Sequence, residues 1–160
     1  MNWTRGEFSI TCDPDKQDLK VIHGFLSRSY WSKGIPEETV KRSIDGSLCF
    51  GLLHKGKQVG FARVISDFAT IAYLGDVFVL EEYRGRGLSK WLMECVSAHP
   101  RLQGLRRWML ATSDAHGLYE KFGFTVLTKP HLFMERHNPN VYSQESSTSE
   151  SAASAPIGNA

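Results

Sequence analysis

Cysteine is scarce in this sequence, long apolar runs are missing, and neither sign of charge dominates. The three cysteines, Cys12, Cys49 and Cys95, are odd in number and far apart, so we expect reduced core thiols rather than disulfides, metal ligands or nucleophiles. No stretch approaches the length of a membrane span, and the first residues lack the apolar centre of a signal peptide. We therefore expect a protein of the reducing cytoplasm with no membrane partner.

The charge balance also argues against a dedicated nucleic-acid surface. Nineteen Lys and Arg face seventeen Asp and Glu, which leaves a net charge of +2, and no long basic run occurs. The apolar fraction of 41% and the charged fraction of 22% are typical of a globular protein. A length of 160 residues suits one domain, which we place at residues 1–137. Residues 138–160 are rich in Ser, Ala and Glu without periodicity, and we expect them to be disordered.

Hydrophobic periodicity predicts an alternation of strands and helices along the domain. We expect helices at Lys16–Ser29, Glu37–Ser43, after Gly87, and at Ala115–Phe122. Strands are expected at Glu7–Cys12, Ser47–Leu53, Gln58–Ile65, Thr70–Val79, Trp108–Ala111, Phe124–Leu127 and Leu132–Glu135. This order indicates an α/β fold with a mixed sheet of about six to seven strands and helices on both faces.

The stretch Asp76–Cys95 reads as a strand, a glycine-containing turn and a helix. Its first residues, DVFV, are typical of a buried strand. The apolar side chains after the turn recur at the spacing of a core-facing helix: Leu88, Trp91, Leu92, Cys95 and Val96. The first turn of such a helix has free N–H groups and partial positive charge.

The turn itself, Arg84-Gly85-Arg86-Gly87, is therefore a candidate anion site. Its glycines permit close approach of the main chain, and its arginines add positive charge. It is not a P-loop, because no Gly-Lys-Ser/Thr ends it, and Lys90 stands where a dinucleotide fingerprint has its third glycine. The alternative is a tight strand–helix connection with two solvated arginines.

A second motif comes one helix and one strand later: Leu118-Tyr119-Glu120-Lys121-Phe122-Gly123-Phe124. Together the two segments resemble the GNAT superfamily of acetyltransferases. RGRGLS is similar to that family's pyrophosphate loop, and LYEKFGF is similar to its tyrosine signature. The resemblance covers roughly residues 8–136 and implies acetyl-CoA as co-substrate, with no metal.

The resemblance also assigns roles to residues of the predicted cofactor site. Main-chain N–H groups of the loop would hold the CoA pyrophosphate, and the strand end before the loop would pair with the pantetheine. Thr112 stands where many members have Asn, so its hydroxyl is a weaker match for the pantetheine arm. The predicted cofactor-binding residues are Phe78, Val79, Arg84, Gly85, Arg86, Gly87, Leu88, Ser89 and Thr112.

Tyr119 is the family's proton donor to the leaving thiolate, although it could instead only pack its helix on the sheet. The general base is open. Asp76 shares a face of its strand with Phe78 and either accepts the amine's proton or pairs with Arg63. The rival bases are Asp67, Asp114 and His116.

The acceptor side is the least defined part of the prediction. Tyr30 and Trp31 would either wall an acceptor pocket or plug the edge of the core. Arg63, Asp67 and His116 complete the substrate-side candidates. We expect an N-acetyltransferase, a monomer or homodimer, that acts on a small-molecule amine. The alternatives are a protein N-acetyltransferase and a non-catalytic acyl-CoA sensor, which would not need Tyr119.

Overall fold

The computed structural model describes residues 1–143 of the 160-residue chain. Its helices are α1 (Leu19–Leu26), α2 (Glu37–Asp45), α3 (Leu88–Ser97) and the short α4 (His116–Tyr119). Its strands are β1 (Asn2–Arg5), β2 (Phe8–Thr11), β3 (Leu48–His54), β4 (Lys57–Ser66), β5 (Ile71–Val79) and β6 (Arg107–Met109). None of the helices in this range is long and apolar enough to cross a membrane.

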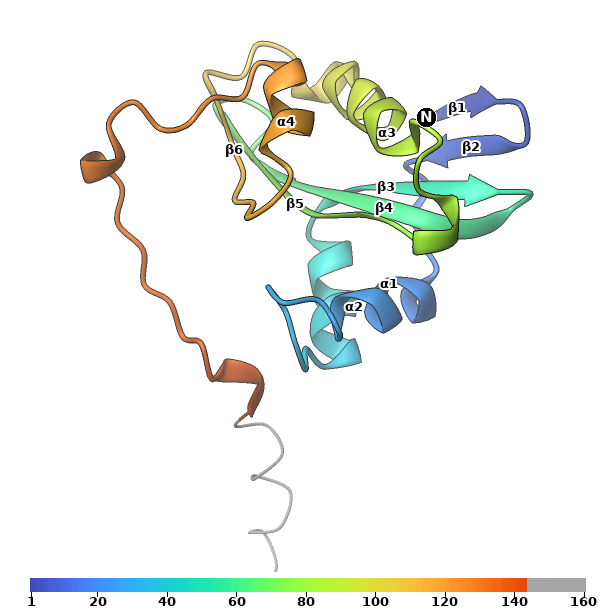
Figure 1. Ribbon diagram of the computed structural model, residues 1–160, viewed down its shortest axis with the longest axis horizontal. Helices are drawn as coiled ribbons and strands as arrows, with labels where there is room; N and C mark the ends of the chain where they lie inside the picture. Colours follow the sequence, from blue (N-terminus) through green and yellow to red (C-terminus); the bar gives the residue numbers. More distant parts are fainter. Residues whose placement is uncertain (144–160) are drawn as a thin grey trace, which may run out of the picture.

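The strands form one mixed sheet in the order of the sequence, β1-β2-β3-β4-β5-β6 (Figure 1). Neighbours from β1 to β5 are antiparallel, whereas β5 and β6 are parallel. This last pairing covers only the first three residues of β5, Ile71–Tyr73, against Arg107–Met109. Beyond Tyr73 the two strands separate, so the second half of β5 has a free edge on that side.

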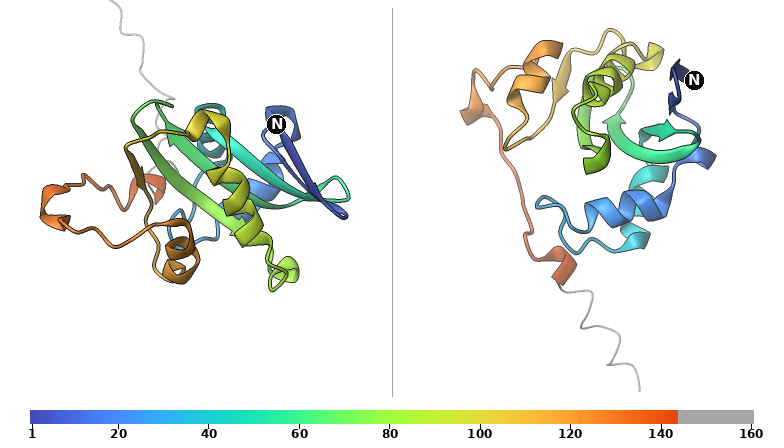
Figure 2. Two further views of the ribbon diagram at one scale, coloured as in Figure 1. Left: turned by 90° about the horizontal axis from the view of Figure 1, so that it is seen from above. Right: turned by 45° about the vertical axis from the view of Figure 1, so that its right-hand side comes forward.

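Helices cover both faces of the sheet, as the sequence predicts (Figures 1 and 2). Alternate residues of β3 and β4 point to opposite faces and so contribute to two cores. Phe50 and Val64 belong to the core under α3, whereas Phe61 belongs to the core under α1 and α2. The predicted stripe of α3 is buried in full: Leu88, Trp91, Leu92, Cys95 and Val96.

Two elements at the N-terminal end differ from the prediction. The strand β1 was not predicted; its side chains lack an apolar alternation, and it pairs with β2 through a turn at Gly6. The predicted helix Lys16–Ser29 is shorter and begins at Leu19, because the Asp18 side chain accepts hydrogen bonds from the N–H groups of Lys20 and Val21.

The predicted strands at Phe124–Leu127 and Leu132–Glu135 are wrong, because neither segment pairs with the sheet. Pro130 begins a 3-10 turn, Pro130–Leu132, and it has no N–H to offer a ladder. Apolar side chains of these segments stay in solvent: Val126, Leu127, Leu132 and Met134. The apolar composition of these two segments was therefore not enough to predict strands. The segment runs away from the body of the sheet (Figure 1).

The three cysteines are unpaired thiols, as predicted. Burial raises the pKa of Cys12 and of Cys95 to about 11 and that of Cys49 to about 12. Of the predicted tail, residues 138–143 end in a 3-10 turn, Val141–Ser143, where Tyr142 packs against the core under α1 and α2. The rest, residues 144–160, lies outside the described residues, so its disorder stays a prediction.

Candidate active site

The start of α3 has the backbone of an anion site. Gly85 and Gly87 have φ values of +75° and +71°, the left-handed region that favours glycine. Gly87 is the N-cap residue and no side chain caps the helix, so the N–H groups of the first turn have no capping partner. A Cβ at either glycine would meet nothing within 4 Å. The glycines are thus required by conformation, and the space above them is open.

The side chains of the two arginines of the loop are hydrogen-bonded to the main chain. Arg84 Nε donates to the carbonyl oxygen of Val79 at 3.1 Å. Arg86 Nη2 donates to the carbonyl oxygen of Glu82 at 3.4 Å, and its guanidinium lies 5.4 Å from the centre of the Tyr83 ring. Both side chains therefore brace the turn and keep positive charge beside it. Leu88 is buried and anchors the first turn of α3, and Ser89 is half-buried beside it.

Phe78 and Val79, the last residues of β5, lead directly into this loop. Both side chains are buried, and Phe78 stacks on Phe25 of α1 with ring centres 3.9 Å apart. Their main chain lies on the part of β5 that β6 leaves unpaired. The free strand edge and the uncapped helix start are thus consecutive in the chain. An extended chain with a phosphate end could lie along both.

Thr112, His116 and Tyr119 line one cavity of about 260 Å³ between β6 and α4. The Tyr119 ring packs edge-on against Phe124 at 6.0 Å and is 9% exposed. Thr112 Oγ1 accepts a hydrogen bond from the N–H of Ala115, so its hydroxyl supports the turn into α4. His116 is exposed at the start of α4.

The Tyr119 phenol keeps its proton over the whole physiological range. Burial raises its pKa to about 12, and the negative charge of Asp114 and the Tyr30 phenol add to the rise. No other described residue bonds to the Tyr119 hydroxyl. Its proton is therefore available to an incoming group. This electrostatic link also shows that Tyr30 and Asp114 lie near Tyr119.

Asp76 lies on β5 with its carboxylate in an ion pair. Arg63 Nε donates to Asp76 Oδ2 at 2.7 Å, and Trp31 Nε1 donates to Asp76 Oδ1 at 3.1 Å. The side chains of Arg63 and Asp76 are only 17% and 12% exposed. Three of the candidate residues, far apart in the sequence, are thus brought together at one point of the sheet.

Tyr30 joins the loop after α1 to the loop after β6. Its hydroxyl accepts from the Ser113 hydroxyl at 2.7 Å and from the Ser113 N–H at 3.3 Å. The ring itself is exposed and stands edge-on to Trp31 at 5.0 Å. The segment between α1 and α2 therefore reaches across from β5 to the side of Tyr119. Ser113 had no signal in the sequence beyond its place next to Thr112.

Asp67 lies apart from the other candidates. Its carboxylate accepts from the Thr70 hydroxyl and from the N–H groups of Ala69, Thr70 and Ile71, which lower its pKa. It therefore closes the turn before β5, at the end of that strand remote from Gly85. Its carboxylate stabilises this turn and lies away from the loop Arg84–Gly87 and from Phe78.

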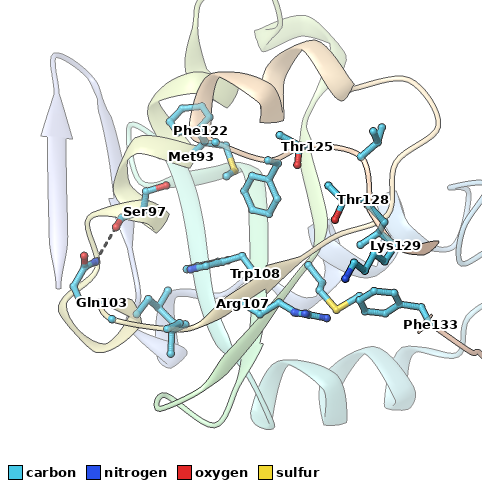
Figure 3. A pocket seen from close by; sticks show the side chains of 18 of the residues that line it. Met93, Ser97, Gln103, Arg107, Trp108, Phe122, Thr125, Thr128, Lys129 and Phe133 are labelled. Atoms are coloured by element: carbon cyan, nitrogen blue, oxygen red, sulfur yellow. Dashed lines mark hydrogen bonds between the residues drawn. The ribbon is translucent and has the colours of Figure 1, made fainter. Parts of the chain in front are cut away.

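A larger cavity, of about 590 Å³, lies between the second half of α3, β6 and the segment after α4 (Figure 3). Trp108 and Phe122 point into it, and Gln103 Nε2 donates to the carbonyl oxygen of Ser97 at its rim. It is the space left where residues 124–135 do not pair with β6. It contains none of the predicted site residues. Within residues 1–143 no cluster of His, Cys, Asp or Glu is arranged to hold a metal ion.

Comparisons with known proteins agree on one family. Residues 45–126 match the family model described as "Acetyltransferase (GNAT) domain". A Gibberella zeae protein assigned as an acetyltransferase is 32% identical over 143 residues, which cover 75% of this chain and 80% of that protein. A crystal structure of a Xanthomonas campestris protein, assigned to the GNAT family, is 58% identical with a TM-score of 0.83 and covers 85% of this chain and 96% of that one. Glucosamine-6-phosphate N-acetyltransferase from Arabidopsis thaliana shares the fold alone, at 19% identity and a TM-score of 0.58 over 81% of this chain and 97% of that one.

Proposed function

The chain belongs to the GNAT family of acetyltransferases, and we propose that it moves an acetyl group from acetyl-CoA directly to a primary amine. One observation carries the choice of acetyl-CoA: an uncapped helix start with two left-handed glycines lies directly after the strand edge that β6 leaves free. The helix start suits a pyrophosphate, and the strand edge suits the amides of a pantetheine arm.

The residues of the loop fit the group they would bind. Gly85 and Gly87 leave the space above the turn open, and the N–H groups from Gly85 to Ser89 would donate to the phosphate oxygens. Arg84 and Arg86 contribute charge without leaving the turn. Thr112 lines the cavity with Tyr119, so its hydroxyl is within the same space that the acyl end would enter.

In the proposed reaction the amine nitrogen attacks the thioester carbonyl carbon, a C–N bond forms, and the C–S bond breaks. Main-chain N–H groups near Val79 would stabilise the oxyanion. The Tyr119 hydroxyl would give its proton to the departing thiolate, and the base would take the proton that the amine loses. A phenol with a pKa of about 12 is a weak acid in water, but the burial that weakens it also makes a thiolate beside it more basic.

The base and the acceptor are the open parts of the proposal. His116 and Asp114 lie near Tyr119, whereas both oxygens of Asp76 already accept hydrogen bonds. An exposed aromatic pair, Tyr30 and Trp31, supports an acceptor pocket on the loop after α1. We propose a small-molecule amine, taken up without a nucleic-acid or membrane partner by a monomer or homodimer in the cytoplasm.

Binding is tested first, by melting the protein with CoA, with acetyl-CoA and with ADP as a control. CoA and acetyl-CoA are both expected to raise the melting temperature, since a ligand at 100 times its Kd stabilises the folded state by about 2.7 kcal/mol. Release of free thiol is then measured with acetyl-CoA and a panel of amino acids, polyamines, aminoglycosides and peptides. CoA binding without thiol release for any amine supports an acyl-CoA sensor instead, and transfer to peptides alone supports a protein N-acetyltransferase.

A further inference from the structure

Strand β5 carries one extra residue opposite β4. Phe61 faces Phe78, but two residues later Arg63 faces Gly75, three residues earlier on β5. Asp76 lies in this bulge with a φ of +54°, a left-handed conformation that is uncommon for a residue with a side chain. A bulge re-aims the strand beyond it, and here that part of the strand is Val77–Val79, the edge that leads into the loop Arg84–Gly87.

The Asp76 carboxylate is connected to three other segments. One oxygen accepts from Arg63 on β4 at 2.7 Å, and the other accepts from Trp31 on the loop after α1 at 3.1 Å. The Arg63 guanidinium extends this series of hydrogen bonds, because its Nη1 donates to the Oγ of Ser47, just after α2, at 3.2 Å. Ser47 Oγ in turn donates to the carbonyl oxygen of Ser43 in α2.

The loop after α1 is attached at both sides of the free edge. Trp31 binds Asp76, and Tyr30 binds Ser113 in the loop that leads to Tyr119. Phe25 adds a stacked contact to Phe78, two residues beyond Asp76, with an angle of 9° between the rings. A shift of the bulge would therefore move both the strand edge and the loop that carries the exposed aromatic pair.

We infer that Asp76 is a positioning residue, which through Arg63 and Trp31 fixes the bulge of β5 and the loop after α1 in one arrangement. This role rests on the proposed acetyl transfer. It accounts for a carboxylate that is only 12% exposed and accepts one hydrogen bond on each oxygen, from Arg63 and from Trp31. It also accounts for an aspartate at this bulge, because aspartate tolerates the left-handed conformation better than most residues and its carboxylate reaches both Arg63 and Trp31 from there.

Four variants separate this role from that of a base. Asp76→Asn keeps the size of the side chain and removes the charge. Asp76→Gly suits the left-handed backbone and removes the carboxylate. It therefore tests the loss of the Arg63–Asp76 ion pair without adding strain to the bulge. Arg63→Met and Trp31→Phe remove one donor each. Glu94→Gln, which breaks the exposed pairs that Glu94 of α3 makes with Arg5 of β1 and with Lys90, is the matched control.

The first readout is independent of activity. The indole N–H signal of Trp31, assigned by its absence in Trp31→Phe, is monitored in ¹⁵N–¹H spectra. Asp76→Asn, Asp76→Gly and Arg63→Met are each expected to shift it, and Glu94→Gln is not. An unshifted indole signal in Asp76→Gly overturns the proposed contact, whether or not the protein transfers acetyl groups.

The second readout is kinetic, with the amine that the panel identifies. Loss of alignment is expected to lower kcat about 10- to 100-fold in Asp76→Gly and Arg63→Met, while the Kd for CoA, whose pyrophosphate contacts lie at the start of α3, changes by a much smaller factor. The pH–rate profile keeps its acid-side limb, the rise in rate as the general base loses its proton, in both. Normal turnover in Arg63→Met with loss of that limb in Asp76→Asn identifies Asp76 as the base and overturns the inference. If the wild-type protein binds CoA but moves no acetyl group, the proposed function fails and the kinetic role of Asp76 with it.

Discussion

The two parts of the candidate site beside β5 are built in different ways, and after the roles proposed for them we call the surroundings of Gly85 and Gly87 the CoA end and the surroundings of Asp76 the acceptor end. At the CoA end the determinants are main-chain: two left-handed glycines and the free N–H groups of α3. At the acceptor end they are side chains, where Trp31 and Arg63 converge on Asp76, and Tyr30 reaches Ser113, 83 residues away in the sequence. The residues of the CoA end are neighbours in the sequence, whereas those of the acceptor end come together only when the chain folds.

This difference has consequences for how each end tolerates change. A main-chain site depends on conformation, so many side chains can vary around Gly85 and Gly87 without loss. A side-chain site depends on pairs, so a change at one partner leaves the other with an unmet hydrogen bond. We therefore expect the CoA end to be common to proteins of different specificity, and the acceptor end to set which amine is used.

The largest expected effect lies where the two ends meet. Tyr119→Phe keeps the ring that packs on Phe124 and removes the proton, so kcat should fall about 100-fold or more. The Kd for acetyl-CoA should stay within about twofold, because the phenol takes no part in holding the pyrophosphate. Steady-state rates and calorimetry measure the two quantities. Tyr73→Phe, an exposed tyrosine of β5, is the control; an equal loss there, or none in Tyr119→Phe, removes the acid role.

The main-chain character of the CoA end is tested by Gly87→Ala. A left-handed alanine costs about 1–2 kcal/mol, which the loop avoids by moving, and CoA binding should weaken about tenfold. Calorimetry gives the Kd, and urea unfolding gives the stability. Gly104→Ala is matched, since Gly104 has a φ of +73° and an equally open surrounding in the connection between α3 and β6. It should lose similar stability and bind CoA normally.

The side-chain character of the acceptor end is tested by Tyr30→Phe. Removal of the hydroxyl breaks both hydrogen bonds with Ser113, so the loop is less well held and the KM for the amine should rise about 3- to 10-fold. The KM for acetyl-CoA should not change. Initial rates with each substrate varied in turn measure both constants. A rise in the KM for acetyl-CoA alone would mean that the loop after α1 belongs to the CoA end.

The smallest effect concerns stability at alkaline pH. Because the pKa of Tyr119 is raised to about 12 in the folded state, its contribution is fully present below about pH 10 and declines as the pH rises toward the folded value. Between pH 9.5 and 11 the wild-type protein should lose about 1 kcal/mol more unfolding free energy than Tyr119→Phe. Urea unfolding at each pH measures this difference. Parallel curves for the two proteins would show a phenol with an ordinary pKa.

The same contrast explains what could be predicted from the sequence. The loop Arg84–Gly87 and the apolar stripe of α3 could be predicted, because glycine spacing and helical periodicity are local patterns in the sequence. The contact of Trp31 with Asp76 was not, since no pattern connects residues 45 positions apart. The Arg63–Asp76 pair was weighed as one of two options, and only the fold gives its geometry. The prediction of strands at 124–127 and 132–135 was wrong, because apolar residues form a strand only where they can pair with the edge of a sheet, and these segments do not pair with one.

The positions and burial of the three thiols bear on the kinetic scheme of the proposed transfer. Cys49 and Cys95 are buried, Cys12 is half-buried, and none of the three lines the cavity beside Tyr119. Burial also raises the pKa of each thiol, so none is placed or activated to hold the acetyl group between two half-reactions. We therefore expect both substrates of the proposed transfer to occupy the protein together, without an acetyl-cysteine intermediate. Double-reciprocal lines drawn at several fixed amine concentrations should cross at a common point, where a ping-pong pathway through cysteine gives parallels.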